Sequence, residues 1–213
     1  MIDNNFSNKN RFFSVSLFFL SLFSIVLVLF KINLTNSLDN FVSSSTVDLT
    51  NTFTYSFAKI ISAIGSVYGV LIIVILLTIY LSLLNKHKEI NLLYFLVFLD
   101  LLIVYSLKHI IGRIRPDNIF LTTLSFPSGH ATMGVVLFGF IFFLFYKNNK
   151  FISIISLLLF IFMGFSRIII NIHWFTDVLA GYFLGLSILF FGLYLYFKKN
   201  IFLEKRKFLI FKN

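Results

Sequence analysis

Long apolar runs alternate with short polar connections along the 213-residue chain. A helical run of about 20 residues matches the thickness of the hydrocarbon core of a bilayer. Several runs are shorter, at roughly 15–17 residues, and need flanking residues to cross. The pattern predicts an all-α protein, a six-transmembrane-helix bundle in a single domain over residues 1–213, with no internal repeat. The predicted spans are Phe12–Phe30, Ile60–Leu84, Leu92–Leu107, Ala131–Tyr146, Phe151–Phe165 and Val178–Phe197.

Composition excludes several classes of protein. Hydrophobic residues make up 59% of the chain and charged residues 12%, with a mean hydropathy of +0.96. A soluble domain of this size needs more polar surface than that. The chain has no Cys, which excludes disulfides and thiolate metal sites. The net charge of +10 does not indicate binding to nucleic acid, because the cations flank apolar runs and form no soluble basic face.

The basic residues also predict the orientation, because cytoplasmic connections carry an excess of Lys and Arg. The first span is too long for a signal-peptide core and is followed by no small-residue cleavage site, so we interpret it as an uncleaved span. The basic tail, residues 198–213, is expected to be a topology signal and an anchor for anionic lipid. We expect a multi-pass protein of the bacterial inner membrane with both termini cytoplasmic. The cations placed on that side are Lys9, Arg11, Lys86, Lys88, Lys147, Lys150, Lys198, Lys199, Lys205, Arg206, Lys207 and Lys212.

Two connections break this pattern. Lys108–His130 and Ser166–Asp177 fall on the opposite, extracytoplasmic face, yet they carry cations. Charged residues at such positions indicate function rather than structure. The four exceptional cations are Lys108, Arg113, Arg115 and Arg167.

The residue types in these connections suit phosphoryl transfer, in which fixed cations stabilise the charge that spreads over the phosphate oxygens. Arg115 and Arg167 can each hold two oxygens, and Lys108 adds a compact point charge. Ser128 and Gly129 precede a predicted helix, so we expect their backbone N–H groups to face an anion.

Two histidines and an aspartate can supply the remaining chemistry. His173 and Asp177 are four residues apart and share a face if that turn is helical. The carboxylate would keep one ring nitrogen protonated and leave the other free to attack phosphorus. His130 would protonate the leaving oxygen. A snorkelling lysine, packed histidines, a plain Pro-Ser-Gly turn and an N-capping Asp177 are the alternatives, and none explains why all these residues gather on one face.

The three segments together resemble a known signature. They read Lys108-x6-Arg115-Pro116, Pro127-Ser128-Gly129-His130 and Ser166-Arg167-x5-His173-x3-Asp177. This resembles the signature of the superfamily that comprises the type 2 phosphatidic acid phosphatases and the vanadium haloperoxidases, and it covers residues 108–177.

The resemblance implies a metal-independent enzyme without a cofactor. It implies that His173 is the nucleophile and forms a phosphohistidine, that Asp177 orients it, and that His130 is the acid. It further implies that the phosphate is bound by Lys108, Arg115, Ser128, Gly129 and Arg167.

Other residues are weaker candidates. Arg113 is a candidate for contact with phosphate or a lipid headgroup, and Pro127 and Ser166 are accessory candidates beside signature residues. Asp100 lies inside the third span, and we expect it to pair with Lys59 or with another helix. Two GxxxG pairs, Gly65/Gly69 and Gly181/Gly185, predict close helix packing.

The leading hypothesis is hydrolysis of a phosphomonoester or pyrophosphate on a lipid that enters laterally from the bilayer. Phosphatidic acid, phosphatidylglycerol phosphate, undecaprenyl pyrophosphate and lipid A phosphates all fit, and the 31–59 stretch and the 117–126 loop are expected to select among them. Transfer of the phosphate to a lipid acceptor is one alternative, and non-catalytic phospholipid binding or transport is another. The apolar spans disfavour halide oxidation. Membrane lipids are the expected partners, with no nucleic acid and no obligate protein partner.

Overall fold

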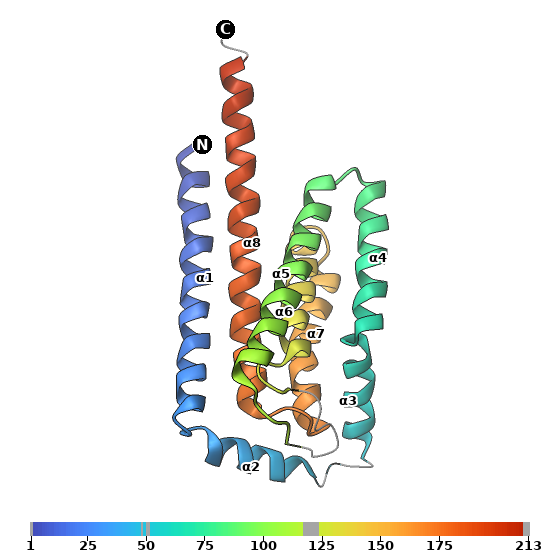
Figure 1. Ribbon diagram of the computed structural model, residues 1–213. Helices are drawn as coiled ribbons and strands as arrows, with labels where there is room; N and C mark the ends of the chain where they lie inside the picture. Colours follow the sequence, from blue (N-terminus) through green and yellow to red (C-terminus); the bar gives the residue numbers. More distant parts are fainter. Residues whose placement is uncertain (1, 48, 50–51, 117–123, 211–213) are drawn as a thin grey trace.

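Helices form every regular element in the part of the chain that the structure, a computed structural model, describes. The described residues are 2–47, 49, 52–116 and 124–210, with side chains described between residues 10 and 198. Figure 1 shows the helices as a bundle with one short helix across one end. The helices are α1 (Ile2–Lys31), α2 (Asn36–Val47), α3 (Phe53–Ile64), α4 (Val67–Leu83), α5 (His87–Ile111), α6 (Gly129–Phe145), α7 (Lys150–Ile169) and α8 (Phe175–Ile210).

The six predicted spans correspond in order to α1, the α3–α4 pair, α5, α6, α7 and α8, so the predicted all-helical membrane bundle is confirmed. Within the described residues, four single helices are long and apolar enough to cross a membrane, and α3 with α4 makes a fifth span bent by 53°. The remaining apolar helix, α6, has 17 residues and is the shortest of the six. The second span therefore begins at Phe53 rather than Ile60, and it is not straight.

The glycine pairs have two different roles. A Cβ at Gly181 would lie 2.9 Å from Ser128 O, and one at Gly185 would lie 2.8 Å from Thr132 O, so α8 approaches the backbone of α6 closely, as predicted. The pair Gly65/Gly69 lies at the bend between α3 and α4, and Gly65 also packs closely, because a Cβ there would collide with Met163 and would lie 2.8 Å from Cδ2 of His130. There the Ser66 side chain accepts from Gly69 N at 3.2 Å and caps α4.

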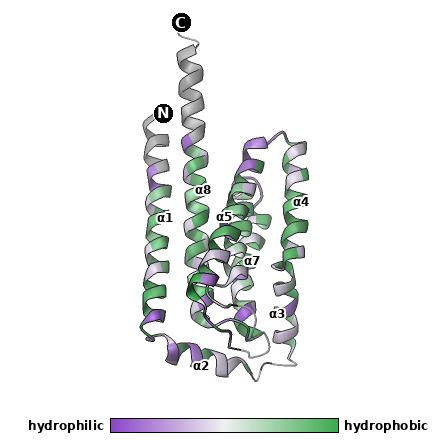
Figure 2. Ribbon diagram, viewed as in Figure 1, coloured by the Kyte–Doolittle hydropathy of each residue, from purple (hydrophilic) through white to green (hydrophobic). Residues whose placement is uncertain are grey.

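The buried helix α6 packs against α5, α7 and α8, while α1 packs along α8. The chain passes from one end of the bundle to the other at each span, so the segments before α2, after α5 and between α7 and α8 all reach the same end (Figure 1). Both termini lie at the opposite end. Hydrophilic residues gather at the end of the bundle where α2 lies and, at the opposite end, around the connection between α4 and α5. The helices between these two ends are apolar (Figure 2).

Helix α2 lies across the end of the bundle and packs against α7 and α8. Asp39 and Thr46 are buried on its inner side, while Leu38, Phe41 and Val47 are exposed. A helix that buries polar groups and exposes large apolar ones beside a membrane bundle suits the interface between headgroups and acyl chains. The 31–59 stretch is thus not a plain polar connection, because it contains α2 and the first turns of α3.

Asp100 pairs with another helix rather than with Lys59. Asp100 is 2% exposed and lies beside the side chain of Thr132 on α6, while one carboxyl oxygen has no hydrogen-bond partner among the described residues. Lys59 lies over the ring of Tyr55, 4.7 Å from its centroid.

Candidate active site

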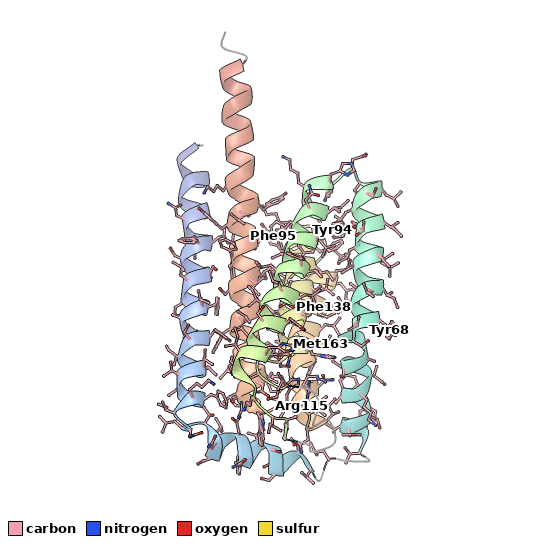
Figure 3. The ribbon with its side chains drawn as sticks, in the orientation of Figure 1. Tyr68, Tyr94, Phe95, Arg115, Phe138 and Met163 are labelled. Atoms are coloured by element: carbon pink, nitrogen blue, oxygen red, sulfur yellow. The ribbon has the colours of Figure 1, made fainter. Side chains whose placement is uncertain are left out.

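The three signature segments meet at the α2 end of the bundle. Lys108 is in the last turn of α5, which Gly112 closes with a left-handed φ of 67° and an N–H bond to Lys108 O at 2.9 Å. This turn directs the chain from Arg113 to Arg115 across the end of the bundle. Figure 3 places Arg115 at this end, with Phe138 and Met163 deeper in the bundle and Tyr94 and Phe95 toward the other end.

His173 and Asp177 form a buried pair. His173 lies just before α8 and Asp177 in its first turn, with Nδ1 and Oδ2 3.2 Å apart. The same Oδ2 accepts from the Trp174 backbone N–H at 3.0 Å. Asp177 is thus the third residue of α8 and reaches back to the residue before the helix, as in a capping box, rather than serving as the N-cap.

Two contacts determine which nitrogen of His173 carries the proton. A carboxylate can only accept and a guanidinium can only donate. Asp177 faces Nδ1, and Arg115 Nη1 lies 3.1 Å from Nε2, so the tautomer that satisfies both has the proton on Nδ1. Burial, followed by the positive charges of Arg115, Lys108 and Arg167, holds the pKa of His173 well below its ordinary value. The ring is therefore neutral at neutral pH, with a lone pair on Nε2.

Lys108 holds the chain ahead of the Pro127 turn, and Arg115 holds the segment before His173. Lys108 Nζ donates to Leu124 O at 2.7 Å and to Ser125 O at 3.2 Å. Arg115 Nη1 donates to Ile172 O at 2.8 Å. Both cations thus lie beside His173 on backbone carbonyls, which carry no net charge, and a dianionic phosphate would attract them more strongly.

The turn from Pro127 to His130 is attached to α8. Ser128 is the N-cap of α6, and its backbone N–H donates to Asp177 O at 3.0 Å. The expectation that this N–H faces an anion is therefore wrong, because the group already has a partner. Ser128 Oγ, in contrast, is buried without a hydrogen-bond partner in the described part of the chain. Its hydroxyl and the N–H of Gly129 at the start of α6 are the groups suited to a phosphate oxygen.

The end of α3 forms a wall of the site that the sequence did not indicate. The Arg167 guanidinium donates to Ser62 Oγ, and the His130 ring hydrogen-bonds the Ser62 backbone. His130 is also close enough to His173, Arg115 and Arg167 to feel their charges. The Ser166 hydroxyl is buried and donates to Met163 O within α7 at 2.7 Å.

Arg113 has partners other than the expected phosphate or lipid headgroup. Nη2 donates to Asp39 Oδ2 at 2.5 Å, and Nη1 donates to Asp177 Oδ1 at 2.7 Å. The guanidinium also lies over the rings of Phe30 and Trp174. Its side chain is 8% exposed. Residues 117–123 of the 117–126 loop, which is expected to influence selectivity, lie outside the described residues. The side chains of the basic tail beyond Lys198 also lie outside them.

Comparisons with known proteins agree with the fold and with the signature. Residues 89–201, more than half of the chain, match the sequence model of the PAP2 superfamily. A 101-residue region is 35% identical to phosphatidylglycerophosphatase B of Bacillus subtilis (strain 168), covering 43% of this chain and 50% of that protein. The chain belongs to the PAP2 superfamily, and it is an integral membrane protein.

Solved structures show the same architecture. A transmembrane PAP2-type phosphatidylglycerolphosphate phosphatase from Bacillus subtilis matches with a TM-score of 0.76 at 24% identity, over 84% of this chain and 94% of that one. LpxE of Aquifex aeolicus matches with a TM-score of 0.58 at 23% identity, over 74% and 93% of the two chains. The matching region of the curated relative is half of its length, whereas the match to the first solved structure extends over nearly all of it.

Proposed function

We propose that the protein is a lipid phosphate phosphatase that works through a phosphohistidine on His173. The observation that carries this proposal is the neutral His173 ring, oriented by Asp177 on Nδ1 and facing Arg115 on Nε2. A neutral imidazole with one fixed proton and one lone pair is a nucleophile, and the neighbouring cations suit a phosphate.

The reaction has two balanced half-reactions. Nε2 of His173 attacks phosphorus and the bond to the leaving lipid oxygen breaks. His130, which takes up a proton when the phosphate anion is bound beside it, gives that proton to the leaving oxygen. Water then attacks the phosphorus of the phosphohistidine, the bond between phosphorus and Nε2 breaks, His130 takes a proton from the water, and inorganic phosphate leaves. Lys108, Arg115, Arg167 and the Ser128 hydroxyl stabilise the charge on the equatorial oxygens in both steps. The charged side chains expected to bind the phosphate, Lys108, Arg115 and Arg167, are cations and would repel a metal ion. Mg²⁺ and Zn²⁺ sites in hydrolases are instead built from carboxylates or several imidazoles, so we expect a metal-independent reaction.

A lipid substrate suits the location of the site. The site lies at the end of the bundle, where the hydrophilic residues of Figure 2 meet the apolar helices, beside the interfacial helix α2. The phosphate group of a membrane lipid lies at this depth in the bilayer. The lipid can therefore enter the site laterally while its acyl chains stay in the bilayer. Phosphatidylglycerol phosphate is the first lipid to test, because the relatives from Bacillus subtilis are named for it.

The purified protein in mixed micelles is expected to release inorganic phosphate from phosphatidylglycerol phosphate at neutral pH with EDTA present. Phosphatidic acid, undecaprenyl pyrophosphate and lipid A phosphates are measured in parallel, and kcat/KM ranks the substrates. Lipid acceptors are analysed for radiolabel from the donor phosphate, which would reveal transfer instead of hydrolysis. A loss of more than about tenfold with EDTA, restored by a divalent cation, would contradict the metal-free mechanism.

We further propose that the site faces the extracytoplasmic side of the bacterial inner membrane and that both termini are cytoplasmic. Support comes from the threading of the helices. The connections that carry Lys86, Lys88, Lys147 and Lys150 lie at the end opposite the site, together with both termini. Cytoplasmic connections are enriched in such residues.

The absence of Cys from the sequence permits a direct test of orientation. Ser44→Cys places a thiol on an exposed position of α2, and Asn148→Cys places one on the exposed connection between α6 and α7. A membrane-impermeant maleimide added to intact spheroplasts is expected to label the first variant alone. After permeabilisation both are labelled. Labelling of Asn148→Cys in sealed spheroplasts would reverse the orientation.

A further inference from the structure

A continuous chain of buried charges leads from α2 to His173. Asp39 on α2 binds Arg113, Arg113 binds Asp177, and Asp177 binds His173, at 2.5, 2.7 and 3.2 Å. Asp39 is 1% exposed and Asp177 is 0% exposed. Neither Asp39 nor Arg113 belongs to the signature. Within the described residues, their side-chain hydrogen bonds go to Thr176, to Asp177 and to each other rather than to the phosphate-binding cations.

Each member of the chain is held by more than one bond. Asp39 accepts from the backbone N–H of Thr176 at 3.0 Å and from its hydroxyl at 2.7 Å. Arg113 Nη1 also donates to the Thr176 hydroxyl at 2.8 Å. Thr176 is the residue before Asp177, so Asp39 and Arg113 together hold the first turn of α8 in place.

The two carboxyl oxygens of Asp177 are thereby given separate tasks. Oδ1 is bound by Arg113, which leaves Oδ2 for His173 Nδ1 and the Trp174 N–H. A carboxylate that met Arg113 alone could turn both oxygens toward the guanidinium, because bidentate pairing is favourable. Asp39 occupies the other guanidinium nitrogen and balances its charge, so Asp177 keeps one oxygen for the imidazole.

We propose that Asp39 and Arg113 are positioning residues that act through Asp177 to fix the orientation of the His173 ring. This inference rests on the proposed function in one respect, namely that His173 is the nucleophile. The two positioning roles affect the attack of His173 on phosphorus and not the binding of the phosphate group. Arg113 is therefore not a phosphate ligand, and α2 contributes to the reaction through Asp39.

The Asp39→Asn variant keeps the shape of the side chain and removes its charge. We expect kcat to fall about 10–100-fold while KM changes less than about threefold, because the cations that bind phosphate are untouched. Arg113→Lys keeps the charge but cannot serve two carboxylates at once, and we expect a fall in kcat of the same order. The double variant is expected to be no slower than the slower single variant, because both act through one chain of contacts.

Two inorganic probes separate positioning from binding without any lipid substrate. Orthovanadate imitates the transition state by bonding to the nucleophile, whereas inorganic phosphate imitates only the bound ground state. Trp174 is the only tryptophan, and it adjoins His173, so its fluorescence can report both titrations. In Asp39→Asn the Kd for vanadate is expected to rise at least about tenfold, and the Kd for phosphate to change less than about threefold.

Ser43→Ala is the matched control. Its hydroxyl donates to Asn171 Oδ1 at 2.8 Å, so it also joins α2 to the segment before His173, but it lies outside the charge chain. We expect all of its constants to stay within about twofold of the wild type. If Ser43→Ala reproduces the loss, α2 acts only by docking and the proposal is overturned. Equal weakening of phosphate and vanadate binding in Asp39→Asn, or additive losses in the double variant, would overturn it too.

Folding and function are checked separately. Thermal unfolding in detergent identifies a variant that does not fold, and if Asp39→Asn fails in this way, Arg113→Lys carries the same set of measurements. A wild-type protein that binds vanadate through His173 but releases phosphate from no lipid would contradict the proposed function. The ratio of the two dissociation constants would still decide the positioning roles.

Discussion

His173→Ala is expected to reduce phosphate release by at least about a thousandfold, because the variant lacks the imidazole that Asp177 orients for attack on phosphorus. The ring is buried between Asp177 and Arg115, and its low pKa keeps Nε2 unprotonated. The measurement is steady-state phosphate release from the best lipid of the panel. It is combined with alkaline quenching of the wild type after brief exposure to radiolabelled substrate, which should trap a base-stable, acid-labile phosphoprotein that the variant lacks.

His109→Ala is the control for this experiment. It removes an exposed imidazole from the same end of the bundle, where Nδ1 contacts the Tyr105 carbonyl of its own helix at 2.8 Å. Its activity is expected to match the wild type within about twofold. Retention of a tenth or more of the wild-type rate by a folded His173→Ala protein would show that a different group attacks phosphorus.

The second large effect is expected for Asp177→Asn. An amide can present its NH₂ group to Nδ1 and so favour the tautomer with the proton on Nε2, which has no lone pair there for attack. In a serine protease the equivalent change costs about 10⁴ in kcat, and we expect a loss of about a thousandfold here. Arg113 also loses one of its two carboxylates in a buried position, so the unfolding temperature should fall as well.

Asp100→Asn provides the comparison, because Asp100 is a buried acid in the same bundle without an ion pair among the described residues. Its kcat is expected to stay within about threefold of the wild type, since Asp100 lies beside Thr132 and not beside His173. The two variants are compared by kcat and by thermal unfolding. An Asp177→Asn protein within tenfold of the wild-type kcat would exclude the orienting role of the carboxylate.

The sequence predicted the bundle well because apolar runs of membrane length carry a strong signal. The signature segments could be recognised in the sequence because they are short and have fixed spacing, and the structure brings them to the same end of the bundle. The bend between α3 and α4 was missed, since an apolar run reads the same whether it is straight or capped internally by Ser66. Helix α2 was missed because its buried side is polar, which reverses the usual pattern.

The residues that support the site could not be read from the chain. Asp39 binds Arg113 across 74 positions of sequence, and Ser62 binds Arg167 across 105. Such contacts depend on how whole helices pack, which no local spacing records. The error over the Ser128 N–H has the same origin. The start of a helix offers unpaired donors in general, but here α8 supplies Asp177 O as an acceptor for one of them.

The contact between Arg115 and Nε2 of His173 links the binding of phosphate to the exposure of the nucleophile. The guanidinium that would grip the phosphate is the same group that covers the lone pair of the nucleophile at 3.1 Å. A ligand must carry enough negative charge to draw Arg115 to itself before Nε2 is exposed, and a phosphate dianion does so. A neutral carboxylic ester, abundant in the surrounding lipid, offers no such attraction and leaves the nucleophile covered. With the proposed function, this pair of side chains would favour the phosphate over the acyl ester of the same lipid molecule.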